Sequence, residues 1–356
     1  MKRAETISPF TVAGTYVGTV VGAGFATGQE VMRFFTFFGA AGTWGVLLST
    51  VLFALLGVVI LQVAHQLKAT SHREVLQDVA GPLVGTILDW VIAFFLFAGA
   101  AIMMAGSGAV FVEHWHLGRG LGTVIMAVVA TGTVLFGLRG VVTSISTVAP
   151  VLIGMVLLIA TGTIIVEGLS PAELSWTSPG GKPTPSWLVA ALLYVSYNLI
   201  LSISVLAPLG GAAPDARKLR LGGLAGGVAL GVGALAINLA LLAGLPDTAG
   251  YEVPMLHLAT RLPGWVAALY GVVLWAEIYT TAVSSLFGLA VRFVPAGRPA
   301  QYRWFTIAAG AGALVLSQVG FAQMVSTIFP IVGWLGLLLI AGLLIRLVRM
   351  QGILTR

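Results

Sequence analysis

The residues best suited to chemistry lie where a long apolar stretch near the start of the chain is interrupted. The segment from Gly14 to Phe35, "GTYVGTVVGAGFATGQEVMRFF", carries Gly-Ala-Gly at its centre and then Gln, Glu and Arg. A helix broken at these glycines exposes backbone N–H and C=O groups. In hydrocarbon each unpaired group costs several kcal/mol, so a break persists only where it faces a cavity, a ligand or an ion. We therefore expect a ligand-binding break from Gly22 to Phe25.

Three charged side chains fall inside apolar segments, where a charge is costly and is by default a functional hypothesis. Glu30 and Arg33 are three residues apart and share a helix face. They could neutralise each other, form an outer gate, or leave Glu30 to carry a proton. Glu277 precedes Thr280 and Thr281 in "EIYTTA", where it could carry a proton or bind an ion directly.

A second polar cluster occurs about half a chain later, in "WLVAALLYVSYNLILSISVLAPLG". Its polar residues gather near the middle of an apolar segment: Ser196, Tyr197, Asn198, Ser202 and Ser204. Five predicted spans separate the start of this segment from the start of the first, so the second half of the chain would enter the membrane in the opposite sense. Interrupted helices at corresponding places in inverted halves mark the binding site of many secondary transporters. We expect the first and the sixth spans both to be broken.

The composition indicates the elements that must position these groups. The chain is 58% hydrophobic and 8% charged, with a mean hydropathy of +1.02, whereas soluble domains carry about 25% charged residues. We therefore expect an all-α integral membrane protein embedded in the lipid bilayer. The absence of cysteine excludes disulfides and Cys-based metal sites. The net charge of +6 does not indicate nucleic-acid binding, because the basic residues lie in short loops between apolar segments.

About ten apolar segments are long enough to cross a bilayer as helices. They lie at about 10–36, 42–67, 84–112, 120–138, 141–166, 187–209, 221–245, 264–292, 304–320 and 326–347. With the N-terminus inside, fourteen Lys and Arg residues fall on the cytoplasmic side and three in the outer loops. This bias predicts a multi-pass protein of the cell inner (plasma) membrane with both termini cytoplasmic.

The spans divide into two halves of five. We expect a first repeat over 1–166, an outer loop over 167–186, a second inverted repeat over 187–348 and a cytoplasmic tail over 349–356. The segment "YEVPMLHLATRLPG" before the eighth span has the apolar spacing of a short helix that could act as an outer lid.

Two further patterns have structural explanations. Gly14, Gly18 and Gly22 form a small-residue stripe, and for Gly14 and Gly18 we expect close helix packing. Asp89, near the cytoplasmic end of the third span, is expected to be solvated or to pair with a loop cation. An enzyme is not expected, because the chain lacks the intramembrane serine, metalloprotease and aspartyl motifs and any Walker sequence.

The segments "GAGFATGQE", "LYVSYN", "VLAPLG" and "EIYTTA" resemble the YkvI family of bacterial membrane proteins along essentially the whole chain. That family is placed in the amino acid–polyamine–organocation (APC) superfamily, whose members share the leucine-transporter (LeuT) fold. The resemblance implies a 5+5 inverted repeat with broken first and sixth helices. It also implies a substrate site formed by Gly22, Ala23, Gly24 and Phe25 in the first span and by Tyr197, Asn198 and Ser202 in the sixth.

The resemblance also implies a coupling ion. In sodium-coupled members of this fold, hydroxyls of the eighth span join carbonyls of the first. The matching groups here are the carbonyls of Gly18, Val21 and Glu277 and the hydroxyls of Thr280 and Thr281. These hard oxygen ligands suit Na⁺, and the Lys that replaces the ion in some proton-coupled relatives is absent from the fifth span.

We thus expect a cation-coupled secondary transporter of a small amino acid or amine-like solute, with Na⁺ as the coupling ion and no other cofactor. The alternatives are a proton-coupled carrier of an organic amine or cation that uses Glu30 or Glu277, and a transporter-like sensor. Arg33 would contribute to gating in either carrier. The sequence indicates neither the substrate nor the oligomeric state.

Overall fold

The fold is given by a computed structural model that describes residues 7–136, 138–170, 175–178, 180–295 and 297–354, with the backbone alone over 138–150 and 350–354. The regular secondary structure of the described residues consists of helices. The α-helices are α1 (Pro9–Val20), α2 (Ala23–Ala26), α3 (Gln29–Phe34), α4 (Ala40–Leu67), α5 (His72–Glu113), α6 (Arg119–Phe136), α7 (Leu138–Glu167), α9 (Trp187–Ala212), α10 (Ala216–Ala243), α11 (Pro254–Ala259), α12 (Gly264–Phe293), α13 (Pro299–Leu316) and α14 (Phe321–Leu354). Short 3-10 helices lie at Thr36–Phe38, Asp247–Gly250 and Ser317–Val319.

Seven of the described helices are long and apolar enough to cross a membrane: α4, α5, α6, α9, α10, α12 and α14. The predicted first span is divided among α1, α2 and α3. Within the predicted fifth span, the apolar helix Val151–Glu167 is shorter than the seven helices that can cross a membrane. The predicted ninth span, α13, is not among the seven. An all-helical membrane architecture is therefore supported, whereas the count of ten spans and the 5+5 repeat stay predictions.

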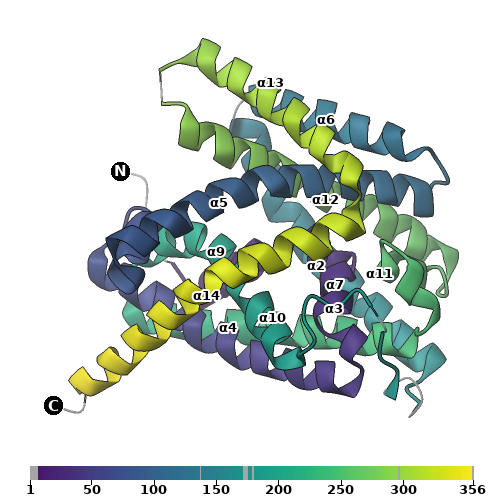
Figure 1. The fold of residues 1–356 in the computed structure, drawn as a ribbon, viewed down its shortest axis with the longest axis horizontal. Coiled ribbons are helices and arrows are strands. Elements are labelled where there is room, and N and C mark those ends of the chain that lie inside the picture. Colours follow the sequence, from purple (N-terminus) through teal and green to yellow (C-terminus); the bar gives the residue numbers. More distant parts are fainter. Residues whose placement is uncertain (1–6, 137, 171–174, 179, 296, 355–356) are drawn as a thin grey trace.

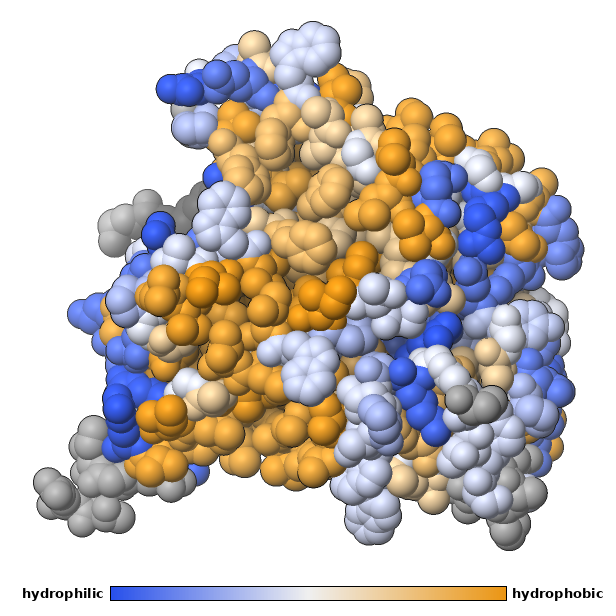
Figure 2. Space-filling view, in the orientation of Figure 1, coloured by the Kyte–Doolittle hydropathy of each residue, from blue (hydrophilic) through white to orange (hydrophobic). Residues whose placement is uncertain are grey.

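The helices run mostly between two opposite ends of the molecule. Both ends of the chain lie at the left of Figure 1, and α11 lies at the right. Figure 2 shows a broad hydrophobic surface across the middle of the same face, with hydrophilic residues gathered toward the left and right. This distribution is the one that a helical bundle needs to lie across a bilayer. The helix α14 continues to Leu354, so part of the predicted tail prolongs the last helix.

The first span is interrupted, as its glycines predict. Helix α1 ends at Val20, Val21 has ψ 93°, and Gly22 is extended with φ −115° and ψ −172°. The single turn α2 follows, and Gly28 then adopts a left-handed conformation with φ 81° before α3 begins. Glycine is favoured there because a side chain is strained at positive φ.

The prediction that the sixth span is broken is wrong. Helix α9 runs without interruption through the polar cluster, because its side chains bond to helix carbonyls instead of replacing helix bonds. Asn198 Nδ2 donates to the Tyr194 carbonyl at 2.9 Å, and Ser202 Oγ donates to the Asn198 carbonyl at 2.7 Å. Ser196 Oγ donates to the Gly333 carbonyl of α14 at 2.5 Å. The cluster is therefore compatible with a continuous helix, and Ser196 joins that helix to α14.

The close packing expected at Gly14 and Gly18 is also wrong. A Cβ atom at either position would meet no atom within 4 Å, and both residues are exposed. The stripe Gly223, Gly227 and Gly231 on α10 is the one that packs closely: a Cβ at Gly227 would collide with the backbone of α4. The same spacing thus serves packing in α10 and leaves an open face on α1.

Candidate functional site

The break in the first span brings two unpaired helix ends together. No described donor reaches the carbonyl oxygens of Gly18 and Val21, because the Gly22 N–H bonds to the Val20 carbonyl at 2.9 Å. No described acceptor reaches the N–H groups of Ala23, Gly24 and Phe25, although all three residues are buried. Unpaired buried backbone groups are rare and costly. The break therefore offers carbonyl oxygens on its α1 side and amides on its α2 side.

Glu30 returns from α3 to this break. Its carboxyl group packs on the face of Gly24, where an added Cβ would collide with it, and its side chain is buried with 6% exposure. Tyr197 of α9 donates its hydroxyl to Glu30 Oε2 at 2.5 Å. The predicted site residues Gly24 and Tyr197 are therefore brought together by Glu30.

Arg33 points away from Glu30. Its guanidinium donates to the Gly181 carbonyl at 3.2 Å and lies 5.8 Å from the centre of the Phe37 ring. None of the ion pairs of the described residues joins Glu30 to Arg33, so the mutual neutralisation that their spacing allows is not adopted. Arg33 instead holds the outer loop.

The eighth span, α12, faces the break from another side. Thr281 Oγ1 lies 3.8 Å from the position of a Cβ on Gly22. Thr280 Oγ1 donates to the Glu277 carbonyl at 3.0 Å, and Glu277 is buried with 5% exposure. The Thr281 hydroxyl is thus the α12 oxygen that lies next to the break, and hydroxyl and carbonyl oxygens are the ligands that suit a hard cation such as Na⁺.

The other predicted substrate residues have different partners. Asn198 and Ser202 bond back along α9, as described above. The Phe25 ring packs against α10, with Cζ 3.1 Å from the position of a Cβ on Gly233. The side chains of Asn198 and Ser202 are therefore occupied along α9, and the Phe25 ring is directed to α10.

Residues that sequence analysis did not single out complete the site. Tyr270 of α12 donates its hydroxyl to the Ala26 carbonyl. It lies two turns before Glu277, so helical spacing could have indicated it. Tyr194 precedes Tyr197 by one turn, is fully buried, and its hydroxyl has no partner among the described residues.

The predicted outer lid is buried. The Met255 N–H of α11 donates to the Thr27 carbonyl at 3.0 Å, and the Met255 side chain covers Gly28. The Glu113 carboxylate at the end of α5 accepts from the N–H groups of Glu252 and Val253 at 2.7 and 3.0 Å. Helix α11 therefore closes over the segment between α2 and α3.

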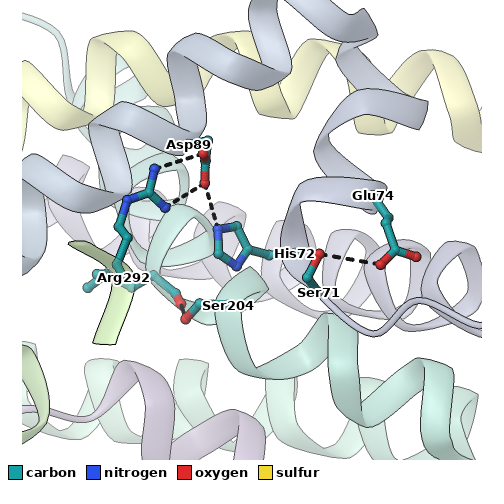
Figure 3. A network of polar contacts seen from close by, with 7 residues as sticks. Ser71, His72, Glu74, Asp89, Ser204 and Arg292 are labelled. Atoms are coloured by element: carbon teal, nitrogen blue, oxygen red, sulfur yellow. Dashed lines mark hydrogen bonds and ion pairs between the residues drawn. The ribbon is translucent and has the colours of Figure 1, made fainter. Parts of the chain in front are cut away.

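A separate ion network joins α5 and α12 (Figure 3). Asp89 of α5 accepts two hydrogen bonds from Arg292 of α12, both of 2.7 Å, and one contact from His72 Nε2 at 2.9 Å. The expectation that Asp89 pairs with a cation is confirmed. Figure 3 places Ser204 of α9 beside this network.

The chain is similar in sequence to two proteins of one bacterium. No protein-family model matches the chain. It is 30% identical over 334 residues to the uncharacterized membrane protein YkvI of Bacillus subtilis (strain 168), covering 94% of both chains. It is 25% identical over 330 residues to the protein YyaD of the same organism, covering 92% of this chain and 94% of YyaD.

Three solved structures share the arrangement of helices. MhsT in complex with L-phenylalanine superposes with a TM-score of 0.64 at 15% identity, over 94% of this chain and 89% of MhsT. A Na⁺-coupled sialic acid symporter gives 0.60 at 15% identity, over 96% and 82% of the two chains. Mhp1 in its inward-facing conformation gives 0.59 at 14% identity, over 93% and 74%. These TM-scores over almost the whole chain establish a common fold, that of the LeuT-fold transporters. The identity to YkvI and its coverage establish more: the chain belongs to the YkvI family of membrane proteins.

Proposed function

We propose that the protein is a secondary transporter that carries a small amino acid or amine-like solute by alternating access, coupled to a cation. The observation that carries this proposal is the buried break of the first span, whose unpaired carbonyls and amides lie beside Glu30. A membrane protein keeps such groups unpaired where a ligand or an ion completes them. The fold shared with a Na⁺-coupled sialic acid symporter and with MhsT, which was solved with L-phenylalanine, supports the same function.

Sodium is the proposed coupling ion. The carbonyls of Gly18, Val21 and Glu277 and the hydroxyls of Thr280 and Thr281 would hold it where α1 meets α12. An ion at this place would fix the end of α1 against α12 and so order the amides that follow. Ordering by the ion raises solute affinity, and the solute raises ion affinity by the same factor.

The proposal also covers the location of the protein and the control of access from outside. The protein would lie in the cell inner membrane with both termini in the cytoplasm, as an APC-superfamily member built from two inverted repeats. Arg33, bound to the outer loop, and α11 would control access from outside.

A proton is the second candidate for the coupling ion, and the surroundings of Glu30 and Glu277 favour it. Both carboxyl groups are buried, and neither has an ion-pair partner among the described residues. An uncompensated charge is too costly at such a site, so each group is neutral or is paired with a cation from outside the chain. Glu30 could then release a proton when a cationic solute arrives.

Uptake into proteoliposomes tests the proposal, with a panel of amino acids and amines and with Na⁺ and pH gradients imposed separately. Sodium coupling predicts uptake driven by a Na⁺ gradient and lost in the Thr280→Ala, Thr281→Ala double variant. Thr306→Ala is the matched control, because Thr306 is a buried threonine on α13 that also bonds to a carbonyl of its own helix. Uptake that follows only the pH gradient and is lost in Glu30→Gln selects proton coupling. Solute binding without any flux would replace transport by sensing.

A further inference from the structure

The position of the Glu30 carboxyl group selects between the two solute classes named above. Resting on the proposed transport function, we infer that the solute is an organic monocation that has no carboxylate of its own, and that Glu30 supplies its counter-charge. The inference stands on three features of the described residues: the position of the Glu30 carboxyl group on Gly24, the absence of a basic side chain paired with it, and the aromatic cluster around its partner Tyr197.

The first feature is that the chain already places a carboxyl group at the break. Glu30 comes from α3 and reaches back over α2, and glycine at position 24 provides the space for it. The bond from Tyr197 at 2.5 Å fixes its orientation from α9. A carboxyl group of the protein therefore already lies beside the α2 turn, whose amides would otherwise receive the carboxylate of an amino acid.

The second feature is charge. Arg33, the nearest basic residue along the chain, is turned toward Gly181. The ion pairs of the described residues use other acidic groups, such as Asp89 with Arg292 and Glu252 with Arg119. A solute carboxylate would add a second negative group against Glu30, whereas an ammonium group would neutralise it.

The third feature is the aromatic cluster around Tyr197, the residue that donates its hydroxyl to the Glu30 carboxyl group. The Tyr197 ring lies 4.8 to 6.3 Å from four other rings, measured between centroids: Phe34, Phe95, Tyr194 and Phe329. Aromatic faces attract cations, and more strongly where water is excluded. The Tyr194 hydroxyl, buried without a partner, offers an oxygen that can accept from an ammonium N–H. Carboxylate, rings and a free hydroxyl together match an amine with an apolar body.

Pairs of probes that differ only in the carboxylate test this inference. Binding to the purified full-length protein is measured calorimetrically for 2-phenylethylamine against L-phenylalanine, and for 3-methylbutylamine against L-leucine. We expect each amine to bind at least about tenfold more tightly than its amino acid, the effect of about one charge-assisted hydrogen bond. Equal or tighter binding of the amino acids, or no binding of either amine, overturns the inference.

Variants locate the effect at Glu30. Glu30→Gln is expected to weaken amine binding by about tenfold or more and to abolish the preference over the amino acid. Glu74→Gln is the matched control, because Glu74 is an exposed glutamate that bonds to Thr70 near the start of α5. Unchanged preference in Glu30→Gln contradicts the inference. The wild-type comparison decides the question even where Glu30→Gln does not fold.

Uptake of the labelled amines separates this inference from the transport function. Tight amine binding without uptake would support the role of Glu30 and contradict the transport function. Uptake of amino acids without preference for the amines would support the transport function and contradict the role of Glu30.

Discussion

Gly24→Ala adds one methyl group at the point where the Glu30 carboxyl group packs, and it tests the geometry of the whole site. The new Cβ would lie 2.7 Å from Glu30 Cδ and 3.0 Å from Cγ, and would collide with Oε1. Glu30 must therefore leave its seat and lose the bond from Tyr197. Gly14→Ala is the matched control, since it makes the same chemical change in the same span but meets no atom within 4 Å.

The expected cost combines three effects. Overpacking costs about 1–3 kcal/mol, and loss of a hydrogen bond to an acidic group costs about 1.5–3 kcal/mol. The helical preference of alanine over glycine returns up to about 1 kcal/mol. We expect Gly24→Ala to lower the free energy of unfolding by about 1.5–6 kcal/mol, while Gly14→Ala leaves it unchanged or raises it by up to about 1 kcal/mol.

Thermal unfolding of both variants in detergent, together with calorimetric binding of 2-phenylethylamine, provides the assay. The Gly24→Ala midpoint should fall and its amine binding weaken, while Gly14→Ala keeps both. A Gly24→Ala protein as stable as Gly14→Ala, with unchanged binding, would refute the placement of Glu30 on the Gly24 face.

Three further changes have defined outcomes. Thr281→Ala should raise the Na⁺ concentration for half-maximal uptake by roughly tenfold, as for loss of one contact; an unchanged value argues against the sodium site. Arg292→Gln leaves Asp89 buried without its main partner, and should destabilise the protein by about 3–5 kcal/mol, whereas Arg119→Gln at an exposed pair should cost about 1 kcal/mol or less. Burial lowers the pKa of His257 on α11, so the unfolded chain takes up its proton first as the pH falls. The thermal unfolding midpoint should therefore decrease as the pH falls below about 6.5, and it should decrease less in the His257→Gln variant. An equal pH dependence of the midpoint in the two proteins would contradict this.

The sequence predicts the first-span break because glycine and polar residues there conflict with an apolar helix. It does not predict the continuous α9, because Asn198 and Ser202 look the same whether they line a cavity or bond to their own helix. The identical spacing of the α1 and α10 glycines does not indicate that only the α10 glycines meet a neighbouring helix closely. The sequence also does not indicate the partner of Glu30, because Arg33 is near in the sequence whereas Tyr197 is brought close only by the fold.

The two parts of the first span are held by different sets of helices. Beyond the break, α9 holds Glu30 through Tyr197, α12 holds Ala26 through Tyr270, and α11 holds Thr27 through a backbone bond. Before the break, α1 packs on α10 and α9, and Tyr16 donates its hydroxyl to the Phe53 carbonyl of α4 at 3.0 Å. A shift of α4 and α10 against α11 and α12 would therefore bend the span at Val21 and Gly22. We expect these two residues to act as the hinge of the access cycle.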